Sequence, residues 1–350
     1  MKKDNYDLVI LTNCPSFYKV NMYNEISKSI SLYVLFLGFS DQVVIDSEFK
    51  KSCNFDFDII YNGQVEKRNI FSSFMTIHSN LSKIKYKKII YGGYIYIEFI
   101  LISFLNSKRI NILETESAAE TALSGWKFRL KVFLLKRYSK VIASGKVHAE
   151  MIRKMKFDGP IEITYGVGII KKLTERFLDN RIQNNPLKFL YVGRLIELKN
   201  VEFIIHEFNK NGLPLTIVGD GILRNKLESL SNQNITFLGF KSNETLSEIY
   251  KMHDVFILPS LQEPWGLVVE EALYWGCTLL LSKNVGSVNE LLNEPNTGIT
   301  FDPLDSSSLR ESISDMIEGY STFKNNVIKF DINKKDIDQV MAHINLVKND

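Results

Sequence analysis

Short apolar runs alternate with amphipathic stretches along the whole chain. In the first half, continuous apolar runs predict strands, and the segments between them have helical spacing. The predicted strands are residues 7–11, 32–37, 88–91, 110–114, 141–144 and 161–164. The predicted helices are residues 19–29, 71–83, 95–106, 127–138 and 147–156. Uninterrupted apolar strands are typical of parallel sheets that helices cover on both faces.

The same alternation begins again after residues 176–186, which are mostly polar and predict a linker. Strands are predicted at 188–192, 215–218, 235–238, 255–258, 278–281 and 299–301. Helices are predicted at 201–209, 222–230, 245–252, 268–275, 288–293 and 334–347. We therefore expect two Rossmann-like, doubly wound α/β domains, residues 1–180 and 186–332. A C-terminal helix in residues 333–350 is expected to pack back toward the first domain. A chain of 350 residues is long for one core, which agrees with two domains.

The composition predicts a soluble globular protein, with 45% hydrophobic and 24% charged residues. No stretch approaches the roughly 18 apolar residues that a membrane span needs. The first residues lack the apolar region of a signal peptide. Cys14, Cys53 and Cys277 form neither a disulfide framework nor a metal-binding spacing. Together these features predict a reducing, cytoplasmic location.

The net charge of +3 conceals an asymmetry between the two halves of the chain. Residues 1–180 contain 27 Lys and Arg against 18 Asp and Glu, a balance of +9. Residues 181–350 contain 16 against 22, a balance of −6. A basic half beside an acidic half suggests that the first half meets an anionic partner, although ordinary surface charge explains it equally well. Nothing in the sequence indicates a nucleic-acid partner.

Cations and glycines follow the first strands of the second half. Gly193 permits a tight turn after the strand, and Arg194 and Lys199 precede the next helix. A guanidinium, an ammonium and nearby backbone N–H groups suit a pyrophosphate, although two such cations are more often simply solvated. Gly219 and Gly221 close the next strand and permit either close approach of a ligand or a plain turn.

The loop after strand 255–258 carries the most informative pattern. Pro264 and Gly266 mark a loop that opens a helix, whose free N–H groups attract phosphate. Glu263 lies in this loop, and Glu271 lies about one turn inside the helix. Two carboxylates at this spacing suit two sets of sugar hydroxyls, because an ionised carboxylate accepts paired O–H donors. A capped surface helix also explains acidic residues, but it does not explain Pro-Trp-Gly after a buried strand.

These motifs together resemble family 4 glycosyltransferases. The stretch from Glu263 to Glu271 resembles that family's signature of two glutamates with seven residues between them. The turns at Gly193 and Gly219 match the family's earlier motifs in order and spacing. The resemblance is specific over residues 187–302 and looser over the first half. It implies the GT-B architecture, in which two domains face each other across a cleft, with retention of anomeric configuration and no metal or other cofactor.

The resemblance also implies a role for each motif residue. Arg194 and Lys199 would hold the donor diphosphate and stabilise the leaving nucleotide, and Glu263 would contact the transferred sugar. These three would be the catalytic residues, while Glu271 would bind the ribose. The remaining contacts would come from Gly193, Gly219, Gly221 and the amides of Trp265, Gly266 and Leu267. The implied reaction moves a sugar from a nucleotide-diphospho-sugar, in most relatives a UDP-sugar, to a glycan or lipid-linked glycan in O-antigen, capsule or lipopolysaccharide synthesis.

Residues after the strands of the first half are candidates for the acceptor side. Gly92, Gly93 and Glu116 each follow a predicted strand, and a helix cap explains Glu116 equally well. The histidine that many relatives carry in this half cannot be placed, because His78 lies in a helical pattern and His148 is expected on the surface. His206, His253 and His343 are expected in the core or on helix faces. The two Asp-x-Asp triplets, at 56–58 and 336–338, are expected to be solvated surface rather than metal ligands.

The segment 126–138 is both basic and aromatic. Such a helix lies on an anionic membrane surface in some proteins, which would make this protein peripheral on the inner face of the cytoplasmic membrane. A core-facing helix with a basic rim explains the same pattern. Other assignments of the whole chain are a GT-B nucleotide-sugar epimerase or an inactive family member that acts as a binding subunit. A dinucleotide oxidoreductase fits poorly, because no Gly-x-Gly-x-x-Gly follows the first strand.

Overall fold

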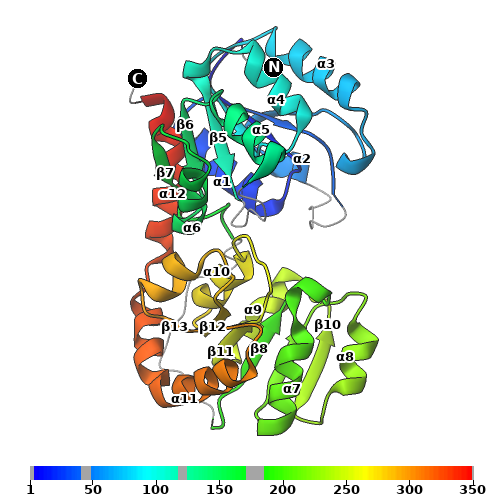
Figure 1. The fold of residues 1–350 in the computed structure, drawn as a ribbon, viewed down its shortest axis with the longest axis vertical. Coiled ribbons are helices and arrows are strands. Elements are labelled where there is room, and N and C mark those ends of the chain that lie inside the picture. Colours follow the sequence, from blue (N-terminus) through cyan, green and yellow to red (C-terminus); the bar gives the residue numbers. More distant parts are fainter. Residues whose placement is uncertain (1–3, 41–48, 117–123, 171–184, 349–350) are drawn as a thin grey trace. The chain divides into compact units, whose positions relative to one another are not determined.

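The chain divides into two compact units, each built on its own parallel sheet (Figure 1). The computed structural model describes residues 4–40, 49–116, 124–170 and 185–348. Unit 1 comprises Met1–Lys171 and Asn333–Asp350, and unit 2 comprises Lys172–Ile332. The predicted linker therefore lies almost wholly outside the described residues. The C-terminal segment groups with the first unit and not with the second.

Unit 1 contains a seven-stranded sheet in the order β3-β2-β1-β4-β5-β6-β7, and every adjacent pair is parallel. Its strands are β1 Asn5–Thr12, β2 Leu32–Phe36, β3 Asp56–Ile59, β4 Lys85–Gly92, β5 Asn111–Thr115, β6 Lys140–Ala143 and β7 Ile161–Ile163. Its α-helices are α1 Phe17–Ser27, α2 Phe49–Ser52, α3 Ile70–Leu81, α4 Ile97–Leu105, α5 Gly125–Leu135, α6 Lys146–Lys154 and α12 Ile332–Lys348. Parallel strands buried on both faces explain the uninterrupted apolar runs in the sequence.

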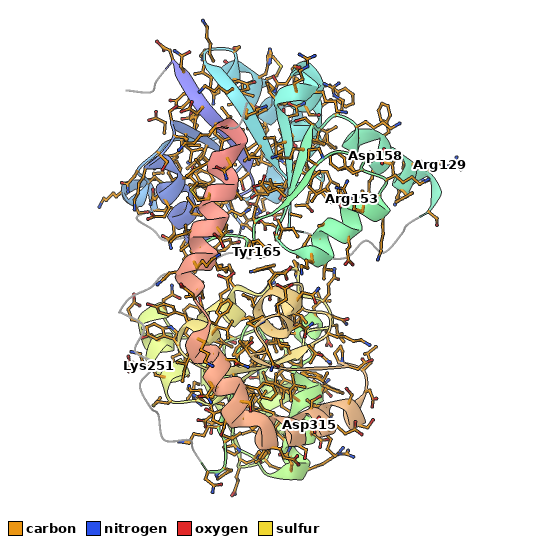
Figure 2. The ribbon with its side chains drawn as sticks, turned by 90° about the vertical axis from the view of Figure 1, so that its left-hand side faces the viewer. Arg129, Arg153, Asp158, Tyr165, Lys251 and Asp315 are labelled. Carbon is orange, nitrogen blue, oxygen red and sulfur yellow. The ribbon has the colours of Figure 1, made fainter. Side chains whose placement is uncertain are left out.

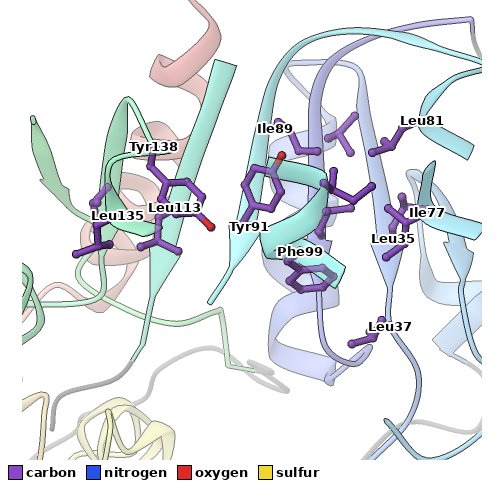
Figure 3. Close-up of a cluster of buried hydrophobic side chains, with 14 of the residues drawn as sticks. Leu35, Leu37, Ile77, Leu81, Ile89, Tyr91, Phe99, Leu113, Leu135 and Tyr138 are labelled. Carbon is purple, nitrogen blue, oxygen red and sulfur yellow. The ribbon is translucent and has the colours of Figure 1, made fainter. Parts of the chain in front are cut away.

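Alternate residues of each strand enter the two apolar clusters on either side of this sheet. In β1, Val9 and Leu11 enter the cluster that packs against α3, α4, α5 and α6. Figure 3 shows part of this cluster, including Ile77 of α3 and Phe99 of α4. Leu8 and Ile10 enter the other cluster, together with side chains of α1 and α12. A strand has a side-chain period of two, so each strand supplies both layers. Helix α12 thus completes the second layer of unit 1 although it is last in the sequence.

Unit 2 contains a six-stranded parallel sheet in the order β10-β9-β8-β11-β12-β13. Its strands are β8 Phe189–Val192, β9 Leu215–Val218, β10 Ile235–Gly239, β11 Val255–Leu258, β12 Thr278–Ser282 and β13 Gly298–Phe301. Its α-helices are α7 Val201–Asn211, α8 Arg224–Leu230, α9 Asn243–Lys251, α10 Leu267–Tyr274 and α11 Ser306–Lys329, and residues Asn289–Asn293 form a π-helix. The long helix α11 is absent from the sequence prediction, although Leu309, Ile313, Met316 and Tyr320 are buried at helical spacing.

Two expectations about surface residues are wrong, those for Asp336 and His148. Asp56 and Asp58 are half-buried on strand β3, where they accept hydrogen bonds from Tyr6 and Tyr33 at 2.7 and 2.5 Å. Asp336 is buried beside Lys335, with 3.1 Å between their charged atoms. His148 is completely buried on α6 and is not a surface residue. Polar residues within short amphipathic segments look solvated in sequence, and only tertiary packing shows which of them are covered.

A buried ion pair fastens α12 to the sheet of unit 1. His343 Nε2 lies 3.3 Å from Glu114 Oε1 at the end of β5. Burial opposes both charges, but their mutual hydrogen bond prevails, so the pKa of Glu114 is lowered and the pKa of His343 is raised. The Glu114 contribution to stability is present above pH 4.5 and is lost as the pH falls through its lowered pKa. The His343 contribution is present below pH 6.5 and is lost as the pH rises through its raised pKa.

We therefore expect His343→Gln to lower the free energy of unfolding most between about pH 4.5 and 6.5, by about 1–3 kcal/mol. Urea unfolding of both proteins across pH 4 to 9 measures the difference. His206→Gln is the matched control, because His206 is exposed on α7 of the other unit. A constant difference at every pH would contradict an ionised pair.

Candidate functional site

The loops after β8 and β11 bring two predicted residues into direct contact. The Lys199 ammonium forms an ion pair with the Glu263 carboxylate, and both side chains are largely buried, with 16% and 12% of their surface exposed. The two loops are also joined through the backbone, because the N–H of Leu261 donates to the carbonyl of Leu198 at 2.9 Å. Strands β8 and β11 are neighbours in the sheet, so their carboxyl ends meet at one edge.

Arg194 lies at the same edge, two residues past the end of β8. The hydroxyl of the buried Tyr191 donates to the Arg194 carbonyl at 2.9 Å, which fixes the turn. Burial and the charge of Glu263 raise the pKa of Tyr191, while the charge of Arg194 lowers it. The charges of Arg194 and Glu263 therefore both affect the pKa of the Tyr191 hydroxyl. The Arg194 side chain itself is exposed and can reach a ligand.

The glycines of this edge allow two loop backbones to touch. Gly219 has φ +134°, and a Cβ there would lie 1.9 Å from the carbonyl oxygen of Gly193. A Cβ on Gly221 would lie 2.4 Å from the carbonyl oxygen of Leu195. Any side chain at either position would separate the loops after β8 and β9. Close backbone packing by itself therefore requires these glycines.

The loop that follows β11 is fixed on both sides before α10 begins. The carbonyl of Glu263 accepts from the N–H of Gly286 at 2.8 Å, and the carbonyl of Trp265 accepts from the hydroxyl of Ser287 at 2.6 Å. Gly266 has φ +90°, and a Cβ there would lie 3.3 Å from the Glu263 side chain. Leu267 is the first residue of α10, so the first turn of this helix begins four residues after Glu263.

The side chain of Trp265 packs in the interior of unit 2. The indole is buried, and its Nε1–H donates to the carboxylate of Glu270 at 2.6 Å. Glu270 is itself fully buried. Sequence reasoning missed Glu270, although the paired glutamates at 270 and 271 were a visible signal. Only the backbone of Trp265 remains for the ligand contact that the sequence predicts.

Glu271 lies one residue further along α10 and has a different environment. Its carboxylate accepts a hydrogen bond from the hydroxyl of Tyr250 at 3.1 Å. Burial raises the pKa of Glu271 to about 7, and the charge of Glu270 adds to this, while the Tyr250 hydrogen bond opposes it. Glu271 can therefore exchange a proton near neutral pH. Tyr250, on α9, has no sequence signal that connects it with Glu271.

The acceptor-side candidates lie at the ends of β4 and β5 in unit 1. A Cβ on Gly92 would lie 3.0 Å from the carbonyl oxygen of Leu11, so Gly92 allows β4 to lie close to β1. Gly93 has φ +103° and open space where a side chain would lie. Glu116 forms a 2.8 Å ion pair with Lys19. These residues belong to unit 1, and the Lys199–Glu263 pair belongs to unit 2.

Lys19 is a charged residue that sequence reasoning overlooked. It is buried on α1, where its ammonium also contacts the Thr12 hydroxyl at 3.3 Å. Burial opposes its charge, yet the charge of Glu116 and weaker contributions from its neighbours raise the pKa of Lys19 well above the ordinary value. Its position three and four residues before buried Met22 and Tyr23 places it on the apolar face of α1, which was the available signal.

The sequence of the second unit has recognisable relatives. Residues 174–335 match the family model described as glycosyl transferases group 1. This segment contains every predicted residue of unit 2, from Gly193 to Glu271. It is 46% of the chain by length, since it holds 162 of 350 residues.

Solved structures match the chain over nearly its whole length. The lipopolysaccharide outer core galactosyltransferase WaaB covers 98% of this chain and 99% of its own, with a TM-score of 0.71 and 14% identity. Anabaena HepE in complex with UDP and glucose covers 96% of this chain and 94% of its own, with a TM-score of 0.63 and 16% identity. The chain has the GT-B fold. At such low identity these likenesses establish the fold alone.

A curated relative is an uncharacterized glycosyltransferase of Methanocaldococcus jannaschii, 31% identical over 165 residues. The alignment covers 44% of this GT-B chain and 42% of the relative. The chain thus spans less than half the length of this protein. In the described residues, no helix is both long and apolar enough to cross a bilayer. The same residues contain no cluster of three or more His, Cys, Asp or Glu side chains that could hold a metal ion.

The raised pKa of Glu271 predicts a specific effect on stability. Because the folded-state pKa lies near 7 and the unfolded value near 4.5, ionisation of Glu271 opposes folding increasingly between these pH values. We expect Glu271→Gln to raise the free energy of unfolding by about 3 kcal/mol at pH 8 and by less than about 1 kcal/mol at pH 5. Urea unfolding at the two pH values measures this. An equal effect at both would show that Glu271 keeps an ordinary pKa.

Proposed function

We propose that this GT-B protein is a retaining glycosyltransferase that moves a sugar from a UDP-sugar to a glycan or lipid-linked glycan acceptor. The observation that carries the proposal is the Lys199–Glu263 pair at the strand ends of unit 2, with Arg194 beside it. The match of residues 174–335 to glycosyl transferases group 1 supports it, because this segment contains the whole constellation.

The proposed chemistry separates a sugar from a diphosphate. The transition state has oxocarbenium character, and negative charge develops on the departing phosphate. Preorganised cations at that position contribute most to the rate, which is the role we assign to Lys199 and Arg194. Glu263 pairs with Lys199, and its remaining lone pairs can accept sugar hydroxyls. The first-turn N–H groups of α10 add donors for phosphate.

We assign binding of the donor nucleotide to Glu271 and to the glycine-containing loops after β8 and β9. A carboxylate on α10 accepts the paired hydroxyls of a ribose, and Tyr250 restricts its orientation. The choice of UDP is supported by the HepE structure, which has the same fold and is described in complex with UDP and glucose. Since Lys199 and Arg194 supply the positive charge, the proposal requires no metal or other cofactor, and transfer should persist in EDTA.

The acceptor is assigned to unit 1. The excess of Lys and Arg over residues 1–180 suits an anionic or lipid-diphosphate-linked glycan, and Glu116 would orient an acceptor hydroxyl. The similarity in fold to a lipopolysaccharide galactosyltransferase supports a role in cell-surface polysaccharide synthesis. A lipid-linked acceptor places the reaction on the cytoplasmic face of the membrane, where the protein would bind peripherally.

We expect Lys199→Ala and Arg194→Ala each to lower the rate of sugar transfer by at least ~10²-fold, the scale for losing one transition-state donor. Lys226→Ala is the matched control, because Lys226 is an exposed lysine of unit 2 that pairs with Glu202. Release of UDP from UDP-sugars, with and without acceptor, measures the rate, and NMR of the product gives its anomeric configuration. Near-wild-type turnover in both variants would remove the diphosphate assignment, and isomerised donor without transfer would favour an epimerase.

We expect Glu271→Ala to weaken nucleotide binding by ~1–3 kcal/mol, or about 5- to 150-fold, because ribose hydrogen bonds are lost. Calorimetric titration with UDP measures the change, after a thermal-shift comparison of UDP-, GDP- and dTDP-sugars has identified the base. A ligand at ~100 times its dissociation constant adds about 2.7 kcal/mol of stability, which such a comparison detects. Unchanged affinity in the variant would contradict the ribose assignment.

A further inference from the structure

Helices α3, α4 and α5 form one continuous layer on unit 1. All three place side chains in the same apolar cluster on one face of the sheet, including Ile77, Phe99 and Leu135 (Figure 3). Helices α3 and α4 are in contact, and the rings of Phe104 on α4 and Phe133 on α5 are stacked at 6.4 Å. The three helices therefore share one outer surface, here called the α3–α5 surface (Figure 1).

This surface exposes many large apolar side chains. On α5, Trp126, Leu130 and Phe133 recur every three or four residues, so they lie on one outward stripe. The exposed apolar residues of the other two helices are Ile70, Phe71 and Met75 on α3, and Ile97, Leu101, Phe104 and Leu105 on α4. Trp126 and Phe71 each keep more than 70% of their surface exposed. Exposed apolar side chains that gather on adjacent helices mark an interaction surface.

The exposed charged residues within and just after the three helices are cations. Exposed cations accompany all three helices: Lys83, Lys108, Arg109, Lys127, Arg129 and Lys136. The only acidic residue in the three helices is Glu98, which is fully buried and bonded to Arg68 at 2.6 and 2.9 Å. Arg129 lies at the outer margin of the unit (Figure 2). The exposed surface of these helices thus combines apolar residues with cations and carries no carboxylate.

Several cations lie against the aromatic rings of this surface. Lys127 Nζ lies 5.8 Å from the ring centre of Trp126, and the Arg137 guanidinium lies 4.9 Å from that of Phe104. Arg137 also donates to the backbone carbonyls of Ser103 and Asn106, each at 2.9 Å. Aromatic rings with adjacent cations suit the boundary between lipid headgroups and acyl chains, where the ring is buried and the charge meets phosphate.

We infer that unit 1 binds the surface of an anionic bilayer through the α3–α5 surface. The charge pattern decides between occupants: a second copy of this surface would oppose cations to cations, whereas anionic headgroups complement all of them. The apolar stripes enter the headgroup boundary, and the cations around them contact lipid phosphates. This inference deepens the proposed function, since it supplies the membrane that a lipid-linked acceptor requires. It concerns residues outside the proposed catalytic site.

Vesicle flotation of the full chain tests the inference. We expect binding to phosphatidylglycerol–phosphatidylcholine vesicles, weak binding to phosphatidylcholine alone, and loss of binding at 1 M salt, where the screening length falls to ~3 Å. Trp126→Ser with Leu130→Ser, and Lys127→Gln with Arg129→Gln and Lys136→Gln, should each weaken binding at least tenfold, since each interfacial cation contributes about fivefold. All five residues are exposed, so the variants should fold normally.

The matched controls are Ile337→Ser, and Lys50→Gln with Lys154→Gln and Lys156→Gln, which change exposed residues of unit 1 outside the three helices. They should float like the wild type. Wild-type protein that stays unbound with anionic vesicles, or controls that lose as much binding as the test variants, would overturn the inference. So would a wild-type dimer in solution that the Trp126→Ser and Leu130→Ser changes dissociate. UDP release from the donor without vesicles should be normal in every variant, which separates this inference from the proposed activity.

Discussion

The ion pair between Lys199 and Glu263 is the contact on which the candidate site depends. Parallel pairing of β8 with β11 places the carboxyl ends of both strands at one edge, and only there can the two loops meet. The Leu198–Leu261 backbone hydrogen bond holds the loops together independently of the side chains. A site built in this way keeps a buried ammonium positioned before any ligand arrives. Preorganisation of this kind is what stabilisation of a leaving phosphate requires.

Several residues near this pair adopt backbone conformations or charge states that oppose folding. Gly219 and Gly266 adopt positive φ angles, which removes the option of side chains there. Glu271 carries a carboxylate in a site that raises its pKa, although a neutral residue of the same shape would be more stable at neutral pH. Groups that oppose folding in this manner concentrate at functional sites. The position of Glu271 on α10, next to the scaffold pair Trp265–Glu270, fits this expectation.

The sequence was sufficient for every strand of both sheets except β3, because each buried parallel strand is a short apolar run that ends in a glycine or charged turn. It was insufficient wherever a residue's role depends on a distant partner. Tyr250 and Glu271 are 21 residues apart, and Glu114 and His343 are 229 apart. The edge strand β3 was missed because its aspartates, bonded to Tyr6 and Tyr33, resemble loop residues. Helix α11 had a clear apolar period, so its omission was avoidable.

The two helix layers that cover the sheet of unit 1 differ in the charged residues that they expose. The buried Glu114 and the partly exposed Glu116 are neutralised by His343 and Lys19, which come from helices α12 and α1. Helices α3, α4 and α5 of the opposite layer contain no exposed carboxylate, so the cations of α5 face solvent together with apolar side chains. Both layers therefore contain a buried ion pair, Glu114–His343 in one and Glu98–Arg68 in the other, and α5 adds exposed positive charge beside the Trp126 ring. The exposed side chains of Trp126 and Phe71 do not contribute to the packing of this layer, and polar residues at these positions would serve the fold equally well.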